Sequence, residues 1–288
     1  MAEPAPGVLY LVGTPIGHLG DLSPRARAVL SAVDHLACED TRRSGLLLQA
    51  LGLKRPLVSF HQHNQASRLP QLLEWLAAGQ SVAVISDAGL PGISDPGEAL
   101  VAAARQQGRP VICVPGPCAI TTALVSSGLP CDRFCFEGFL PPKAAQRRQR
   151  LRQLATEERT MVVFEAPHRL IALLEDLLAV LGDRPLRVAR ELTKRHEEQV
   201  GPTVADALEH FRQHPPLGEC TLVLGGAPTM APVWEEGKLR EALAALMAEG
   251  HSAREASQRL AARTGHRRRD LYALLHRPEV GESGEPLA

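Results

Sequence analysis

Short apolar runs alternate with longer amphipathic stretches along most of the chain. Runs at residues 8–12, 81–85 and 111–114 each lead into a turn rich in Gly, Pro or Asp, and a stretch with helical spacing of apolar residues follows. Strands that are covered by helices on both faces are continuously apolar, because neither face meets water. This pattern predicts an α/β protein with parallel strands.

The alternation divides into two halves. Residues 8–127 are predicted to form one α/β domain and residues 128–228 a second, with Ser126–Pro130 as the candidate linker. Residues 1–7 form a Pro- and Ala-rich tail that is expected to be disordered. The predicted strands are 8–12, 34–38, 57–60, 81–85, 111–114, 134–140, 160–164, 187–190 and 218–226. The predicted helices include 24–32, 68–78, 98–105, 143–152 and one that ends at residue 181.

A third part, residues 229–288, is predicted to be a small helical domain with a tail. A second linker is expected at residues 227–232, and helical periodicity then marks 239–248, 253–264 and 267–275. This arrangement resembles a helix–turn–helix unit. It is compatible with docking to nucleic acid and equally with a small packing or dimerisation bundle.

Composition narrows the class of protein. The chain has 288 residues, 44% hydrophobic and 22% charged, and its net charge is zero, so no global field indicates nucleic acid. Six cysteines show no CxxC pair, which predicts reduced thiols, with Cys113, Cys118 and Cys135 mostly buried. Neither a signal peptide nor a membrane-spanning run is present in the sequence, which predicts a cytoplasmic protein.

The loop at residues 86–97 carries three Gly, two Pro and two Asp between a predicted strand and a helix. Such a loop is either ordinary chain punctuation or a ligand-binding turn, since open α/β sheets bind ligands at the carboxyl ends of their strands. Two similar turns, at 13–21 and 115–122, follow other predicted strands. The first lacks a complete GxGxxG and has no P-loop Lys, which argues against nucleotide phosphate.

Several charged clusters have both a structural and a functional interpretation. Residues 39–43 follow a strand and fit either a capped, solvated helix start or a site. The cations at 143–152 fit a solvated helix or an arm that contacts phosphate. No acid or Cys completes a ligand set around His61 and His63, so no metal site is expected.

Ordered motifs along the chain identify a family. The motifs are LYLVGTPIG at 9–17, CEDTR at 38–42, SFHQHN at 59–64, SDAG at 86–89, PGPCA at 115–119, FEGF at 136–139, EAPHR at 165–169 and ARELTK at 189–194. Together they resemble the tetrapyrrole methylase superfamily, and within it the bacterial methyltransferases that act on a cytidine ribose of 16S ribosomal RNA. The resemblance covers roughly residues 8 to 275.

The resemblance implies two α/β domains with S-adenosylmethionine in the cleft between them, and a homodimer. Many of the implied contacts are small or apolar, which fits recognition through backbone groups. The residues implied to touch the cofactor are Pro15, Ile16, Asp87, Ala88, Gly89, Ile93, Ser94, Cys118, Ala119, Ile120, Phe164, Glu165, Ala166 and Thr221.

The implied reaction moves a methyl group to a ribose 2′-hydroxyl in the decoding region of 16S ribosomal RNA. A hydroxyl is a weak acid, so a base should assist; Glu39, Asp40, His61, Glu191 and Lys194 stand at predicted strand ends and are the candidates. Cations that would bind the RNA or the small ribosomal subunit are Arg42, Arg43, Lys143, Arg147, Arg148, Arg150, Arg169, Arg267, Arg268 and Arg269.

Two other functions remain open. Tetrapyrrole methylases carry GxGxGD in the first loop and GDP in the third, where this chain has Gly-Thr-Pro-Ile-Gly and Ser-Asp-Ala-Gly. Those departures favour RNA, whereas the neutral net charge favours a tetrapyrrole or another small molecule. A non-catalytic RNA-binding module that uses the C-terminal helices is the third possibility.

Overall fold

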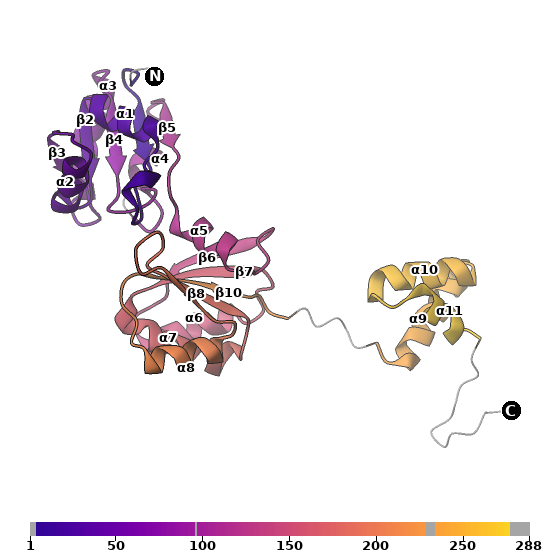
Figure 1. Cartoon of the computed structure of the whole chain (residues 1–288). Coiled ribbons are helices and arrows are strands. Elements are labelled where there is room, and N and C mark those ends of the chain that lie inside the picture. The colour runs from indigo at the N-terminus through magenta and orange to yellow at the C-terminus, as the bar shows by residue number, and fades with distance from the viewer. Residues whose placement is uncertain (1–3, 96, 229–233, 277–288) are drawn as a thin grey trace. The chain divides into compact units, whose positions relative to one another are not determined.

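In the computed structural model, which describes residues 4–95, 97–228 and 234–276, the strands pair into two five-stranded sheets, and three helices follow them in the chain (Figure 1). The α/β prediction with a C-terminal helical part is therefore confirmed. The sheets belong to one unit, residues 1–227, and the last helices to another, residues 228–288. The start of the predicted tail at 1–7 and most of the predicted linker at 227–232 lie outside the described residues.

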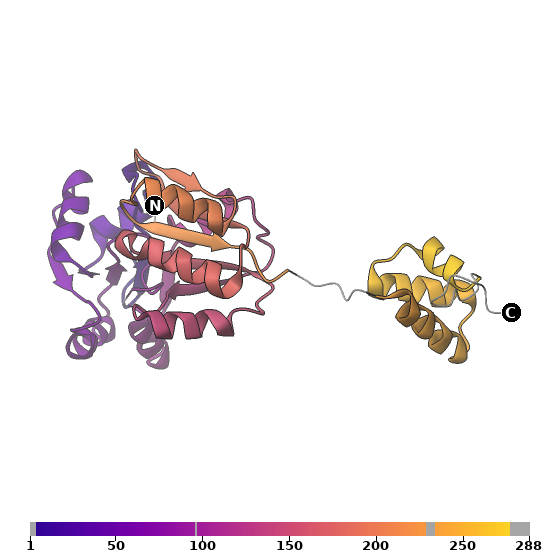
Figure 2. The same ribbon diagram turned by 90° about the horizontal axis from the view of Figure 1, so that it is seen from below.

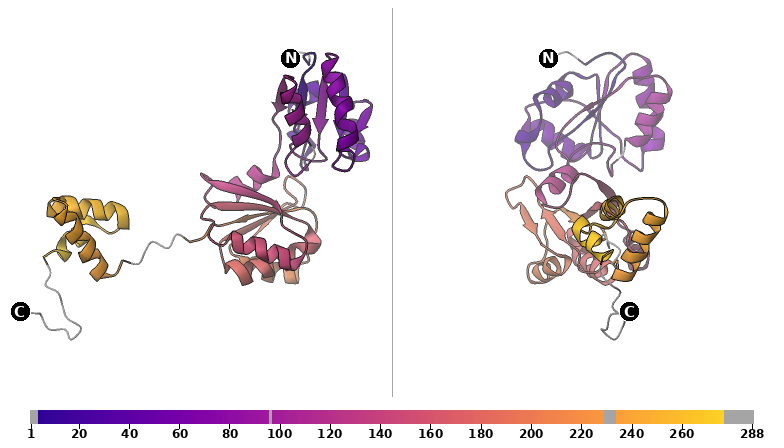
Figure 3. Two further views of the ribbon diagram at one scale, coloured as in Figure 1. Left: turned by 180° about the vertical axis from the view of Figure 1, so that it is seen from behind. Right: turned by 90° about the vertical axis from the view of Figure 1, so that its right-hand side faces the viewer.

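The first sheet is wholly parallel, in the order β3-β2-β4-β1-β5. Alternate residues of its strands enter two separate cores, because Tyr10 packs with α1 and α2 while Leu9 packs with α3 and α4. Figure 3 (right) shows this sheet between two helix layers. The elements are β1 (Leu9–Val12), the 3-10 helix η1 (Leu19–Asp21), α1 (Pro24–Ala32), β2 (His35–Cys38), α2 (Thr41–Ala50), β3 (Leu57–Ser59), α3 (Gln65–Ala77), β4 (Val82–Ile85), α4 (Glu98–Gln106) and β5 (Val111–Val114).

The second sheet has the order β6-β7-β10-β8-β9, and only its β6–β7 pair is parallel. Helices α6, α7 and α8 cover one face (Figure 2), where Met161 and Val163 point. The other face, with Val162 and Val223, packs against α5. The elements are α5 (Ala119–Ser126), β6 (Phe134–Phe139), α6 (Ala144–Gln153), β7 (Thr160–Glu165), α7 (Pro167–Leu181), β8 (Leu186–Arg190), β9 (Glu198–Val200), α8 (Val204–Gln213) and β10 (Cys220–Leu224).

The third part comprises α9 (Glu236–Ala248), α10 (Ala253–Thr264) and α11 (Arg268–Leu274), which share a core around Leu243, Leu260 and Leu271. A capping box at Ser252 starts α10, and Gly265 in the left-handed conformation ends it. None of the described helices is long and apolar enough to cross a bilayer.

The cysteine prediction is partly wrong. All six cysteines are free, but Cys113 is exposed and Cys118 and Cys135 are only half-buried, while Cys38 and Cys220 are buried. The exposure of Cys113 follows from its strand, because β5 is an edge strand of the first sheet.

Candidate active site

The strand order of the first sheet creates a crevice between β1 and β4. From β1 the chain continues to β2 on one side, and from β4 it continues to β5 on the other, although β1 and β4 are neighbours. Loops that diverge in this way leave space for a ligand at the carboxyl ends of the strands. The loops that follow β1 and β4 are therefore expected to line a site.

Thr14 and Gly89 fix these two loops to each other. The backbone N–H of Thr14 donates to Gly89 O at 2.9 Å, and the N–H of Gly89 donates to Thr14 O at 3.1 Å. The buried Thr14 hydroxyl lies 3.3 Å from both Ser86 O and Gly89 O and donates to them. The loop after β4 thus leaves its strand in a defined direction.

Gly13 and Gly116 bring the loop after β5 against the loop after β1. A Cβ on Gly13 would lie 2.7 Å from the Cα of Gly116, and a Cβ on Gly116 would lie 2.9 Å from the backbone of Gly13. Side chains at either position would separate the two loops. The turn that begins α5 is therefore held at the same edge of the sheet.

A loop of the second sheet docks onto the first. The N–H of His18 donates to Thr193 Oγ1 at 3.1 Å, and a Cβ on Gly17 would lie 2.9 Å from Leu192 O. Glu191 and Thr193 have positive φ values of 52° and 63°, a costly conformation for residues other than glycine. This contact connects loops from the two sheets at one side of the crevice.

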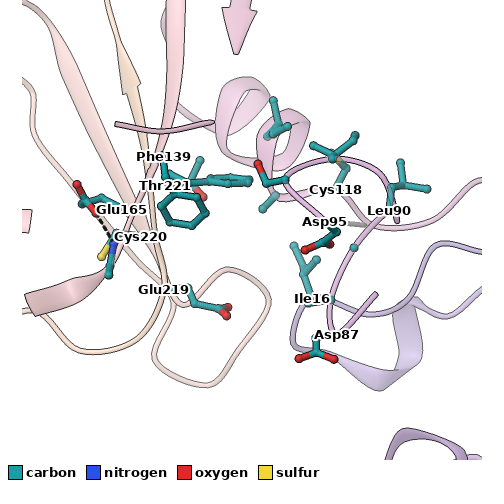
Figure 4. A pocket seen from close by; sticks show the side chains of 18 of the residues that line it. Ile16, Asp87, Leu90, Asp95, Cys118, Phe139, Glu165, Glu219, Cys220 and Thr221 are labelled. Carbon is teal, nitrogen blue, oxygen red and sulfur yellow. Dashed lines mark hydrogen bonds between the residues drawn. The ribbon is translucent and has the colours of Figure 1, made fainter. Parts of the chain in front are cut away.

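These loops and the nearby edge of the second sheet enclose a cavity of ≈ 380 Å³. Ligand pockets of proteins measure about 300–1,000 Å³, so it can hold a small molecule. Figure 4 shows Asp87, Asp95 and Cys118 on one side and Phe139 and Thr221 on the other. The lining residues come from the ends of both sheets and from the start of α5.

The cavity brings together nearly all residues that the family resemblance implied for the cofactor. Only Pro15, which is buried in the loop after β1, does not line it. The predicted residues that line it are Ile16, Asp87, Ala88, Gly89, Ile93, Ser94, Cys118, Ala119, Ile120, Phe164, Glu165, Ala166 and Thr221.

Sequence reasoning missed six lining residues, namely Leu90, Asp95, Phe139, Pro167, Glu219 and Cys220. Five of them, all except Phe139, lie within two positions of a predicted residue along the chain, so extending each motif by one or two positions would have found them. Phe139 is the last residue of β6, which pairs in parallel with β7, and the centroid of its ring lies 5.6 Å from the ring centroid of Phe164. Asp95 follows the predicted Ser94, but its proximity to Glu39 depends on how the loop folds.

An acidic group occupies one wall of the cavity. Burial and the nearby Asp87 raise the pKa of Glu39. Burial, then Glu39 and Asp87, raise the pKa of Asp95 to about 7, although a hydrogen bond from Ser86 works against this. Arg43 partly neutralises the group, since its Nη1 lies 3.4 Å from Asp87 Oδ2.

A second hollow of ≈ 510 Å³ adjoins the cavity. Glu39, Arg43 and Asp87 line both, so they form a common wall. The hollow is also lined by Asp40, Thr41, Arg42, Ser59, His61 and His63. Three of the predicted base candidates, Glu39, Asp40 and His61, therefore line the same hollow.

Asp40 has a structural task in this hollow. Its Oδ1 caps α2 by accepting from the N–H of Arg42 at 2.8 Å, and its carboxylate forms an ion pair with the Arg42 guanidinium at 2.7 Å. Both contacts stabilise the charged form and hold the pKa of Asp40 well below its usual range. A carboxylate so stabilised is a weak base.

The other two base candidates, Glu191 and Lys194, line neither the cavity nor the hollow. Lys194 Nζ lies 3.0 Å from Glu191 Oε1 and 3.4 Å from Glu219 Oε2. Burial opposes the charge on Lys194, but the two carboxylates outweigh it and raise its pKa, so the amine stays protonated. This ion pair stabilises the loop after β8. Neither side chain lines a space from which it could accept the proton of a bound hydroxyl.

The predicted RNA-binding arm on α6 is largely occupied by other contacts. Arg147 is buried and its guanidinium lies 2.6 Å from the carboxylate of Asp176 of α7, which is also buried. The positive charge of Arg147 compensates the charge of this buried carboxylate. Arg148 also pairs with Asp176, at 2.6 Å, and Arg150 pairs with Glu137 at 2.7 Å. The burial of Arg147 removes it from any surface that could contact RNA.

The remaining predicted cations differ in accessibility. Arg169 is half-buried, 3.1 Å from Glu165, and donates to Leu140 O at 2.7 Å. Lys143 is exposed, and Arg42 and Arg43 are exposed at the second hollow. Arg267, Arg268 and Arg269 are exposed at the start of α11.

No group of three or more His, Cys, Asp or Glu side chains in the described parts of the chain is arranged to hold a metal ion. The rings of His61 and His63 lie 6.0 Å apart, edge to face.

Comparisons with known proteins agree with this architecture. The sequence model of the family described as Tetrapyrrole (Corrin/Porphyrin) Methylases matches residues 8–208. A Synechocystis protein named Ribosomal RNA small subunit methyltransferase I is 51% identical over 270 residues, which is 93% of this chain and 97% of the relative. A Thermotoga maritima protein of the same name is 46% identical over 220 residues, 76% of this chain and 99% of the relative.

A solved structure shares the two-sheet fold. The uroporphyrin-III-C-methyltransferase of Thermus thermophilus superposes with a TM-score of 0.55 at 25% identity, covering 76% of this chain and 94% of that one. Each chain thus has counterparts of most of the other's elements.

Proposed function

Since this chain belongs to the tetrapyrrole methylase family, we propose that it methylates the RNA of the small ribosomal subunit, with S-adenosylmethionine as methyl donor. The observation that carries the proposal is the 51% identity, across nearly the whole length of both chains, to a ribosomal RNA small subunit methyltransferase I. The target is the ribose 2′-hydroxyl of a cytidine in the decoding region of 16S ribosomal RNA.

The residues of the cavity suit this cofactor. Phe164, Ile120 and Ala119 offer apolar surface for a nucleoside, and Asp87 and Asp95 offer negative charge for a cationic tail. The cavity also matches a small ligand in volume. S-adenosylmethionine supplies a methyl group already activated by the positive charge on its sulfur. The protein therefore has to position the acceptor, exclude water and manage one proton.

The second hollow is where we place the acceptor ribose. It adjoins the cavity through Glu39, Arg43 and Asp87 and opens beside the exposed Arg42. Glu39 is the base we favour, since it lines both spaces and its raised pKa brings its affinity for a proton closer to that needed at neutral pH. Arg42 and Arg43 would contact the phosphates on either side of the ribose.

Arg267, Arg268 and Arg269 would add a second RNA contact in the helical unit. They are exposed at the start of α11, where only Arg269 has a close acidic partner among the described residues, Asp270 at 3.2 Å. This contact would strengthen binding without being essential for chemistry. The relative from Thermotoga maritima that is named Ribosomal RNA small subunit methyltransferase I aligns over 99% of its own length but over only 76% of this chain. About a quarter of this chain therefore lies outside that alignment.

Methylation of a tetrapyrrole or another small molecule is the second candidate function. The similarity to the uroporphyrin-III-C-methyltransferase favours it, but that identity is 25% against 51% for the ribosomal RNA enzyme. A non-catalytic RNA-binding role would not explain why the chain forms a cavity of the size that holds a small ligand.

Mapping of ribose methylation in 16S ribosomal RNA tests the proposal. Cells that lack this protein should lose one 2′-O-methyl group in the decoding region, and purified protein with S-adenosylmethionine should restore it on small subunits or on naked RNA. An unchanged methylation map would refute the proposal. Calorimetry then separates the remaining functions, because a non-catalytic RNA-binding protein would give no heat with S-adenosylmethionine, whereas a small-molecule methylase would.

We also propose that the protein acts in the cytoplasm as a homodimer. Exposed apolar side chains on elements of the second sheet and the helix α5 packed against it support an interface, since Val125 on α5 is 73% exposed and Phe134 on β6 is 38% exposed. Light scattering on the purified chain would measure the molecular mass, and a monomer at micromolar concentration would contradict the dimer.

A further inference from the structure

The side chains of Glu39 and Asp95 lie close to each other on the wall of the cavity. Glu39 follows β2, whereas Asp95 belongs to the loop after β4, so folding brings together two acids that are far apart in the sequence. An ionised carboxylate can only accept hydrogen bonds. Two ionised carboxylates at this place would therefore repel each other with no bond between them, and a single shared proton relieves that repulsion.

The surroundings leave the pair without a cation of its own. Arg43, the one cation among the described residues that line the cavity, forms an ion pair with Asp87. Asp87 adds a further negative charge to the pair, and at Glu39 this charge is opposed first by Arg43 and then by His61. The Ser86 hydroxyl is the neutral partner of Asp95.

The far wall does not supply a cation to the pair either. Glu165 is buried, its Oε1 lies 3.1 Å from Arg169 Nε, and its Oε2 has no hydrogen-bond partner. Glu219 is held by Lys194 at 3.4 Å. The cavity therefore carries an excess of carboxylates over cations, and it fits a ligand with positive charge.

We infer that Glu39 and Asp95 share one proton before the cofactor binds, and that they release it to solvent when a cationic group of S-adenosylmethionine lies against them. The inference rests on the proposed function, because it assumes that cofactor. The O–H bond of the protonated carboxyl breaks, its proton passes to the buffer, and the resulting pair of carboxylates faces the positive charge.

The charge of the ligand makes the inference specific. S-adenosylmethionine carries two cationic groups, the sulfonium and the amino-acid ammonium, whereas the reaction product S-adenosylhomocysteine keeps only the ammonium. If the pair faces the sulfonium, it favours the donor over the product, and product release is coupled to the return of a proton. If it faces the ammonium, both molecules displace the proton.

Isothermal titration calorimetry of the full chain tests this inference. Binding of S-adenosylmethionine at pH 7, measured in phosphate and in Tris, gives the number of protons released from the difference in observed heat. With a pKa of about 7 for the pair, we expect about half a proton at pH 7 and a Kd that falls about tenfold between pH 6 and pH 8. Asp95→Asn should abolish the release, whereas Glu137→Gln, which alters an acid that pairs with Arg150 and does not line the cavity, should keep it.

The possible results fall into three groups. Release with S-adenosylmethionine alone assigns the sulfonium to the pair, and release with both ligands assigns the ammonium; either supports the inference. Binding without proton release in the unchanged protein, or release that persists in Asp95→Asn, overturns it and leaves the proposed function intact. Absence of any binding refutes the proposed function itself.

Discussion

Arg147 of α6 and Asp176 of α7 form a buried ion pair with 2.6 Å between Nη2 and Oδ2, and their side chains are only 6% and 3% exposed. Arg147 also donates from Nε to the same oxygen at 2.7 Å, so two nitrogens of the guanidinium bind the carboxylate. Arg148 occupies the second carboxylate oxygen, at 2.6 Å. This pair connects two of the helices that cover the second sheet.

Arg147→Ala should destabilise the protein by about 3–5 kcal/mol, because it leaves the Asp176 charge buried with only one partner. Urea unfolding monitored by circular dichroism would measure the loss. Arg150→Ala is the matched control on the same helix, since its pair with Glu137 is more exposed and is worth about 0.2–1 kcal/mol. Equal effects of the two substitutions would contradict the structural role given to Arg147.

Gly13→Ala should lower the free energy of unfolding by about 1–3 kcal/mol, because the added methyl group would meet the Gly116 backbone at 2.7 Å. Gly45→Ala provides the opposite control. Nothing lies within 4 Å of a Cβ there, and the position is inside α2, where Ala is favoured over Gly by roughly 0.5–1 kcal/mol. Thermal unfolding of both variants checks the prediction; Gly13→Ala as stable as the unchanged protein would argue against the close contact between the loops.

Asp87→Asn should weaken S-adenosylmethionine binding by roughly tenfold or more, the loss expected when a hydrogen bond to a charged group, worth about 1.5–3 kcal/mol, is reduced. Asp87 lines the cavity and accepts from the N–H of Asp40 at 3.1 Å, a contact that the amide oxygen of Asn can retain. Calorimetry measures the Kd, with Glu137→Gln as control. An unchanged Kd would remove Asp87 from the cofactor site.

Asp95→Asn should stabilise the protein more at pH 8 than at pH 5. The pKa of Asp95 is raised from 3.8 to about 7 in the folded protein, so the folded state binds the proton more tightly than the unfolded chain does. Its contribution to stability is therefore present at low pH and is lost as the pH rises through about 7. Melting temperatures at the two pH values check the sign, and a larger gain at pH 5 would contradict it.

Replacement of Arg267, Arg268 and Arg269 by Gln should weaken binding to small ribosomal subunits and leave the Kd of S-adenosylmethionine unchanged. Each lost phosphate contact should reduce the slope of log K against log salt by about 1. Arg212→Gln is a suitable control, since this exposed residue of α8 pairs with Glu175. Unaltered subunit affinity in the triple variant would assign the helical unit a role other than RNA binding.

Much of the fold follows from local patterns. The run at 81–85 predicted β4 because its apolar residues suit a strand buried on both faces, and the observed strand begins one residue later, at Val82. Ser23 and Pro24 predicted the start of α1 because both suit a helix N-terminus. The grouping of 87–89 with 118–120 at one cavity came from the family resemblance, not from the pattern of the chain.

The errors and omissions have a common physical cause. Arg147 looked like a surface cation because its partner Asp176 is 29 residues away and on another helix. Asp95 was overlooked because its importance depends on Glu39, which a different strand delivers. Local sequence cannot reveal a residue whose environment is built by distant segments.

The span of the cavity lining along the chain has a consequence for synthesis of the protein. Ile16 and Thr221 both line the cavity, and His18 meets Thr193 across 175 positions of sequence. A nascent chain therefore cannot form this binding site until β10 has left the ribosome. Cofactor binding can therefore stabilise the first unit only after nearly all of its residues have been synthesised. Before that point, only the folding of the first parallel sheet protects the nascent chain from aggregation.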